Sequence, residues 1–179
     1  VVVPPRPGLA VLKGAVMLGL GASDRFASRV ARCTYAVSTA VLYDDADPDH
    51  IGRSTFMSMS QGKLQIFVDG QLSVIVRHGT KIRAGEVHEG RVLQILGHGS
   101  AALTTFSLYT AASPTSRWVN DAGVIKIGSV ELPATPGDRV RVDLSFGASE
   151  IRASIVNTTA GTAVPASIQY DFHKLAAGQ

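Results

Sequence analysis

The sequence contains very little cysteine: among its 179 residues only Cys33 carries a thiol. A single cysteine excludes an intramolecular disulfide and a zinc site built from pairs of cysteines. The chain therefore shows no sign of an oxidising compartment, and we expect it to be cytoplasmic.

Charge is also scarce, because charged residues make up only 17% of the chain and the formal net charge is +3. The one tight basic cluster, Arg25, Arg29 and Arg32, has no aromatic residue interleaved as a platform for single-stranded nucleic acid would need. The apolar stretch at residues 8–20 carries Lys13 and is shorter than the ~20 residues that span a bilayer. We therefore expect neither nucleic acid nor a membrane as a partner.

The motifs of common catalytic and nucleotide-binding sites are missing. The five histidines lack H-x-x-x-H and H-E-x-x-H spacing, and there is no G-x-x-x-x-G-K-[ST] loop or G-x-S-x-G elbow. A G-x-G-x-x-A match at residues 97–102 precedes the strand-like run LTTFSLY, so no helix is available to hold a pyrophosphate. The acidic residues 44–49 lack the glycine and glutamate of a calcium loop. The sequence therefore predicts that this chain is no enzyme and holds no metal or cofactor.

Alternating apolar residues are what the chain does have, most clearly in its last third. Residues 139–146, 150–157 and 164–171 each place apolar side chains at every second position, which predicts antiparallel strands. The turns FGAS and NTTAG between them supply residues that tolerate positive φ. We therefore expect two hairpins here.

Further strands are expected upstream, at residues 30–42, 55–59, 64–68, 72–76, 91–96, 103–109 and 124–132. Asp69-Gly70 is predicted to form a hairpin turn, and residues 91–96 are expected to pair with residues 103–109. Roughly seven to nine strands without intervening helices predict an all-β fold, an antiparallel β-sandwich.

One short helix is expected before the sandwich, at residues 7–20. It begins with a proline in its first turn and stops at Gly19 and Gly21. Its apolar residues cover almost the whole circumference, so we expect it to be buried between layers. Without such layers it must find cover on the sandwich or on a second copy of the chain, or be disordered.

The final strands, together with GVIKIGSVELP before them, resemble the peptide-binding β-sandwich of the heat shock protein 70 family, and are most similar to its divergent member 12 branch. The matching residues are Gly128, Pro133, Glu150, Ile151, Thr159 and Gly161. The segment VVVPPRPGLAVLKGAVMLGL looks like the last strand and helix of the family's actin-like ATPase domain. The two resemblances occur in the order that the family requires.

The resemblance implies a domain organisation. Residues 1–21 would end an ATPase domain, residues 22–31 would be the interdomain linker, residues 32–173 the β-sandwich and residues 174–179 a tail. The linker departs from the family because it is basic and poor in leucine, which bears on coupling to ATP. ATP itself is expected in the ATPase domain of a longer protein and not in this chain.

The resemblance also implies a function, the capture of extended apolar segments of unfolded proteins in a groove. One wall of the groove would present Val37, Thr39 and Ala40, and the other wall would present Leu103, Thr104 and Phe106. The insertion DDADPDHIGRSTFMSMSQGK and the loop GHGSAA would arch over the peptide. No helical lid follows Phe172, so we expect weak binding, on the order of micromolar or poorer. The partners would be unfolded clients and the chain's own ATPase domain.

Two alternatives remain open. The groove could be degenerate and serve as a protein-interaction or regulatory platform for the ATPase part, whereas an open apolar channel beside Val37 and Phe106 would favour peptide capture. An unrelated carbohydrate-binding sandwich is the other alternative, and an exposed Trp118 on a flat face would favour it.

Overall fold

A computed structural model of the chain describes residues 7–19, 28–83, 85–97, 100, 102–147 and 151–167. Its elements are α1 (Pro7–Gly19), β1 (Ser28–Val30), β2 (Thr34–Leu42), the short 3-10 helix η2 (Pro48–His50), β3 (Thr55–Ser60), β4 (Lys63–Val76), β5 (Lys81–Arg83), β6 (Val87–Glu89), β7 (Leu93–Gln94), β8 (Ala102–Ala111), β9 (Val124–Ala134), β10 (Arg139–Phe146), β11 (Ile151–Asn157) and β12 (Thr162–Ser167).

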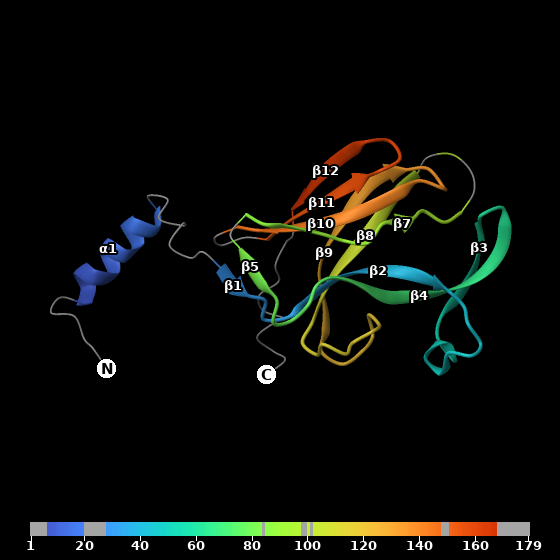
Figure 1. The fold of residues 1–179 in the computed structure, drawn as a ribbon, viewed down its shortest axis with the longest axis horizontal. Helices are drawn as coiled ribbons and strands as arrows, with labels where there is room; N and C mark the ends of the chain where they lie inside the picture. The colour runs from blue at the N-terminus through green and yellow to red at the C-terminus, as the bar shows by residue number, and fades with distance from the viewer. Residues whose placement is uncertain are drawn as a thin grey trace.

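The strands form two antiparallel sheets that face each other (Figure 1). The first sheet has the strand order β3-β4-β2-β8-β9, and the second has the order β12-β11-β10-β6, with β7 also paired to β10. A separate two-stranded ribbon joins β1 to β5. The antiparallel β-sandwich expected from the sequence, with one short helix before it, is confirmed.

The core lies between the two sheets and follows from strand alternation. Every second residue of β10 points inward and is buried, namely Val140, Val142, Leu144 and Phe146. Val37, Leu108 and Leu132 of the first sheet belong to the same apolar cluster. Burying one such side chain contributes about 1.5–3 kcal/mol, so this interface is what holds the two layers together.

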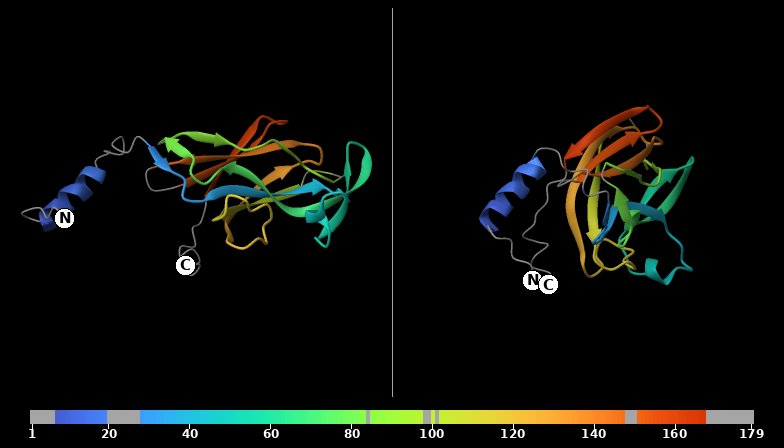
Figure 2. Two further views of the ribbon diagram at one scale, coloured as in Figure 1. Left: turned by 60° about the horizontal axis from the view of Figure 1, so that its bottom comes forward. Right: turned by 60° about the vertical axis from the view of Figure 1, so that its left-hand side comes forward.

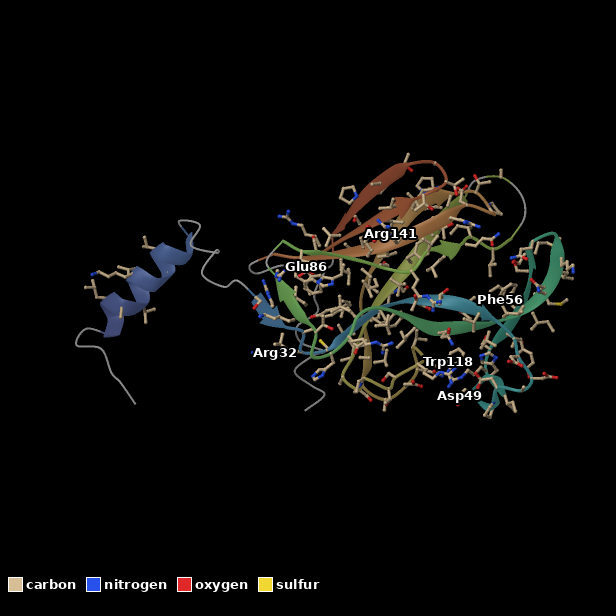
Figure 3. All side chains as sticks on the ribbon, in the orientation of Figure 1. Arg32, Asp49, Phe56, Glu86, Trp118 and Arg141 are labelled. Carbon is tan, nitrogen blue, oxygen red and sulfur yellow. The ribbon has the colours of Figure 1, made fainter. Side chains whose placement is uncertain are left out.

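A partly buried ion pair lies on the other face of β10. The carboxylate of Asp143 is 5% exposed, and it accepts hydrogen bonds from Nε and Nη2 of Arg141 at 2.7 and 2.9 Å. Arg141, which is labelled in Figure 3, also pairs with Glu89 of β6 at 2.9 Å. The hydrogen bond to Asp143 is the main cause of a raised pKa of Arg141. These contacts attach β6 to the centre of its sheet.

The Asp69-Gly70 turn prediction is wrong, because β4 runs through both residues. Thr39 lies opposite Gln71 and Val41 lies opposite Val68, so Asp69 and Gly70 together face one residue of β2. This is a β-bulge, and Gly70 has the positive φ of 82° that such an irregularity accommodates.

The actual turn lies at Gln61-Gly62, between β3 and β4. Both residues have positive φ, 51° and 75°, as a two-residue hairpin turn of type I′ requires. Ser60 and Lys63 are paired directly beside the turn. The β3–β4 hairpin therefore projects from one end of the sandwich (Figures 1 and 2).

The expected pairing of residues 91–96 with residues 103–109 is also wrong. β7 pairs with β10, where Gln94 lies opposite Arg139, whereas β8 pairs with β2 and β9. The connection between β7 and β8 therefore crosses from one sheet to the other. The expected strand at 30–42 is divided, since β1 ends at Val30 and β2 begins at Thr34.

The helix α1 is not buried between layers as expected. Val11 and Leu12 are 74% and 62% exposed, because no described element packs against them. Among the described residues, no helix has the length and hydropathy needed to cross a membrane. Residues 22–27 of the expected linker, the strand end at 168–171 and the tail at 174–179 lie outside the described residues.

Asp138 closes the turn between β9 and β10 and should make folding sensitive to acid. Its carboxylate accepts hydrogen bonds from the Thr135 N–H and from Nδ2 of Asn157, both at 2.9 Å, and these lower its pKa below the ordinary 3.8. The ionised Asp138 carboxylate therefore stabilises the folded state at pH values above its ordinary pKa. This contribution to the free energy of unfolding is lost as the pH falls through the lowered pKa.

We expect Asp138→Asn to be less stable than the parent in urea unfolding at about pH 7, with the difference shrinking at about pH 3. Asp45→Asn is the control, since the Asp45 carboxylate is exposed and makes no hydrogen bond in the described structure. A difference for Asp138→Asn that stays constant with pH would contradict this role of the carboxylate.

Candidate functional site

Two neighbouring strands of the first sheet part from each other. β2 and β8 are paired from Thr34 opposite Ala111 to Val37 opposite Leu108. Beyond this point β2 pairs only with β4, and β8 pairs only with β9. Among the described residues, the facing sides of residues 38–42 and 102–107 therefore have no partner strand, so main-chain N–H and C=O groups on these sides lack the hydrogen bonds of a sheet.

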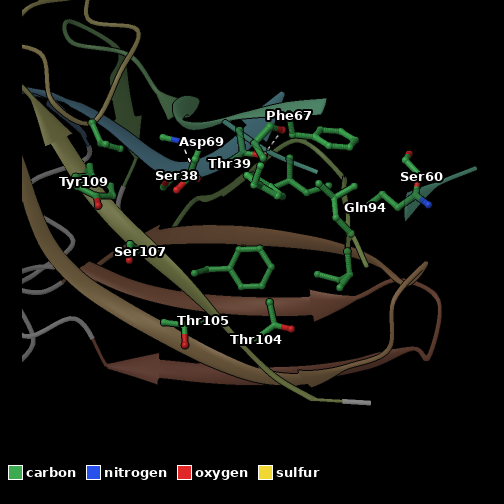
Figure 4. A pocket seen from close by; sticks show the side chains of 18 of the residues that line it. Ser38, Thr39, Ser60, Phe67, Asp69, Gln94, Thr104, Thr105, Ser107 and Tyr109 are labelled. Carbon is green, nitrogen blue, oxygen red and sulfur yellow. Dashed lines mark hydrogen bonds between the residues drawn. The ribbon is translucent and has the colours of Figure 1, made fainter. Parts of the chain in front are cut away.

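A cavity of about 730 Å³ opens where the strands part (Figure 4). Its lining residues are Ser38, Thr39, Ala40, Phe56, Ser60, Phe67, Asp69, Gly70, Val92, Leu93, Gln94, Ile95, Leu96, Thr104, Thr105, Phe106, Ser107, Tyr109 and Val119. A volume in this range is typical of ligand sites in proteins.

Two segments flank the cavity. We call residues 55–68, the β3–β4 hairpin, the arm, and residues 92–97, which include β7, the strap. The main-chain N–H of Gly97 in the strap donates a hydrogen bond to the carbonyl oxygen of Met59 in the arm at 3.4 Å. The arm and the strap are thus joined beside the cavity, although they lie far apart in the sequence.

The two faces of the arm differ because its side chains alternate. Phe56 and Phe67 lie opposite each other in the hairpin with their rings stacked at 5.9 Å, and both line the cavity. The other face is apolar and solvent-exposed, with Met57, Leu64 and Ile66 exposed by 64%, 60% and 46%. The arm thus contributes one wall of the cavity and a separate apolar surface.

Four of the six expected groove residues line the cavity, namely Thr39, Ala40, Thr104 and Phe106. Val37 does not, because it is the last residue of β2 paired with β8 and is packed in the core at 2% exposure. Leu103 does not line the cavity either, and its side chain is 62% exposed.

No residue of the arm or of the strap was among the expected groove residues, although the insertion that contains residues 55–63 was expected to arch over the peptide. The alternation in TFMSMS would have indicated that Phe56 and Ser60 share one face. No local signal shows that this face turns toward β8, because that depends on long-range packing.

Ion pairs hold the loop that leads from β2 into the arm. Arg117, in the loop after β8, pairs with Asp47 at 3.1 Å and also with Asp49. The Asp49 N–H, followed by the Arg117 guanidinium, lowers the pKa of the Asp47 carboxyl. Both carboxylates belong to the loop around η2, so this loop is fastened to the one that follows β8.

The side chain of Trp118 packs against the same loop and is buried, with 2% of its surface exposed. The guanidinium of Arg53 lies 4.0 Å above its ring centroid, and the ring of His50 meets it edge-on at 5.6 Å. His50 is itself held in place, because its Nδ1 accepts a hydrogen bond from the Asp44 N–H at 3.0 Å. The exposed, flat Trp118 surface that would favour a carbohydrate-binding sandwich is therefore absent.

Among the described residues, no three His, Cys, Asp or Glu side chains gather closely enough to hold a metal ion. No protein-family model matches the sequence, and comparison with curated proteins gives no match. The function therefore has to be inferred from the parted strands and the cavity.

Proposed function

We propose that this chain binds extended segments of unfolded polypeptide, as the peptide-binding domain of a divergent, heat shock protein 70-like chaperone. The observation that carries the proposal is the parting of β2 and β8 around the cavity. The strand sides that face each other there offer main-chain hydrogen bonds to any extended chain, whatever its sequence. Such binding needs no reactive side chain.

The arrangement of the arm and the strap supports the same proposal. The family resemblance led us to expect arching segments in the insertion after β2 and in the connection before β8. The arm belongs to the first and the strap leads into the second, and Gly97 and Met59 connect them beside the cavity. A segment bound there would lie between the free strand edges and these two flanking segments.

Within this proposal, unfolded proteins and an adjoining actin-like ATPase domain are the partners, and ATP is the ligand of that ATPase domain. The chain itself is not an enzyme and needs no cofactor, because capture of a peptide uses only main-chain and packing contacts. The setting is cytoplasmic.

The second candidate is an interaction or regulatory platform. It is favoured by the solvent-facing side of the arm, where Met57, Leu64 and Ile66 are all exposed. It is also favoured because Val37 lies in the closed core and not beside an open apolar channel.

The decisive experiment measures fluorescence anisotropy with labelled, reduced and carboxymethylated α-lactalbumin, a permanently unfolded polypeptide. We expect saturable binding with a Kd on the order of micromolar. Thr39→Trp should weaken binding at least about tenfold, since the indole fills part of the cavity from a half-buried lining position.

Thr162→Trp, at an exposed position of β12 in the other sheet, is the matched control and should bind as the parent does. Circular dichroism of each variant establishes that it is folded. Absence of binding by the folded parent, or equal binding by Thr39→Trp, would refute peptide capture and favour the platform.

A further inference from the structure

We propose that the cavity prefers segments whose central side chains are polar, such as serine, threonine, asparagine and glutamine, over leucine-rich segments. This preference rests on the proposed function, because it concerns the same cavity. It departs from the apolar clients that the family resemblance implies.

Unpaired hydroxyl groups are the first reason. Ser38 of β2, Ser60 of the arm and both Thr104 and Ser107 of β8 line the cavity from three sides (Figure 4). None of these four hydroxyls has a hydrogen-bond partner among the described residues, whereas Thr105, which also lines the cavity, donates to Glu131. Each free hydroxyl can donate one hydrogen bond and accept others.

The strap adds an amide to this set. The side chain of Gln94 lines the cavity and likewise has no hydrogen-bond partner among the described residues. A carboxamide both donates and accepts, so it matches the side chains of asparagine and glutamine and the hydroxyls of serine and threonine.

The one large apolar lining side chain that lies midway along the parted strands is already part of the core. Phe106 points from β8 into the space between the sheets, is only 7% exposed and belongs to the main core cluster. The large apolar lining side chains that remain exposed, Phe56 and Val92, belong to the arm and the strap. On the parted strands β2 and β8, every lining side chain other than Ala40 and Phe106 carries a hydroxyl.

The cost of desolvation sets the direction of the preference. A leucine side chain that displaces water from these hydroxyls leaves them without a hydrogen-bond partner, which is unfavourable. A polar side chain replaces the lost water with new hydrogen bonds. Because these hydroxyls are partly exposed, the penalty is smaller than for fully buried groups, yet it has the same sign.

The test uses two labelled peptides with identical flanks, one with a centre of Asn, Gln, Ser and Thr and the other with a centre of Leu. We expect the polar peptide to bind the full chain at least about fivefold more tightly in anisotropy titrations. Thr104→Val removes one hydroxyl without changing the shape of the side chain, so it should weaken the polar peptide about threefold to tenfold and should not weaken the leucine peptide. Thr162→Val makes the same chemical change on β12 and should alter neither affinity.

The possible outcomes separate the two proposals. Tighter binding of the leucine peptide, or equal effects of Thr104→Val on both peptides, overturns the polar preference and leaves peptide capture standing. Failure of the folded chain to bind either peptide or unfolded α-lactalbumin overturns peptide capture, and the preference with it. Tighter polar binding that Thr104→Val reduces supports both.

Discussion

Phe146→Ala is expected to lower the free energy of unfolding by about 3–5 kcal/mol, as for other large side chains removed from a protein core. Phe146 ends β10 and is 2% exposed. Its ring lies edge-on to the rings of Tyr35 in β2 and His88 in β6, with ring centroids 5.3 and 5.6 Å away. The side chain thus contacts both sheets, so its removal leaves a cavity at their junction that neither sheet can fill alone.

Urea denaturation with linear extrapolation measures this effect. Phe56→Ala is the matched control, because Phe56 lies on the arm and remains 40% exposed, and we expect it to cost about 1 kcal/mol. A loss for Phe146→Ala no larger than that of the control would contradict the role assigned to Phe146.

Gly90→Ala is expected to cost about 3 kcal/mol, at the upper end of the usual range for overpacking. A Cβ at position 90 would lie 2.4 Å from the carbonyl oxygen of Val142 and 3.4 Å from Cγ1 of Ile75. The same Val142 oxygen accepts a hydrogen bond from the Gly90 N–H at 3.1 Å. Since main-chain atoms cannot move aside as a flexible side chain can, the alanine must separate this segment from β10.

Gly79→Ala provides the comparison. Gly79 has a positive φ of 83° and nothing within 4 Å of its added Cβ, so only backbone strain of about 1 kcal/mol is expected. Because the strap begins shortly after Gly90, Gly90→Ala should also weaken binding of unfolded α-lactalbumin. If the two alanine variants were equally stable, the contact between the added Cβ at position 90 and the Val142 carbonyl oxygen would not lower the free energy of unfolding, and the prediction would be wrong.

Local patterns were enough to predict the adjacent strands β10 and β11 of the second sheet, whereas β6 was not expected. β10 occupies residues 139–146 as expected, and β11 follows it within one residue of its predicted start. Their signals are alternation along each strand and a turn between them, and both lie within a short stretch of sequence. Physical causes that act over a few residues can be recognised from the sequence alone.

The Asp69-Gly70 prediction failed because a local pattern fits two structures. Aspartate followed by glycine suits a hairpin turn, but glycine at positive φ equally suits a bulge. β2 continues past the dipeptide as a partner strand, and its presence selects the bulge. The actual turn at Gln61-Gly62 was missed because glutamine seldom adopts a positive φ.

The candidate groove residues came from the family resemblance and not from a local pattern. The resemblance placed Leu103, Thr104 and Phe106 on one wall, and of these Thr104 and Phe106 line the cavity. Whether Val37 lies in the open or the closed part of the other wall, on β2, depends on where β2 and β8 separate, which is a long-range property. The partner of β7 is equally non-local, since Gln94 meets Arg139 across a long stretch of sequence.

The alternation of the arm separates two properties that evolution can change independently. Substitutions on one side of the hairpin, at Phe56 or Phe67, alter what the cavity admits and leave the outer surface unchanged. Substitutions on the other side, at Met57 or Ile66, alter that surface and leave the cavity lining unchanged. A substitution on one side of the arm therefore need not disturb the other side, because neighbouring residues of a single strand point to opposite faces.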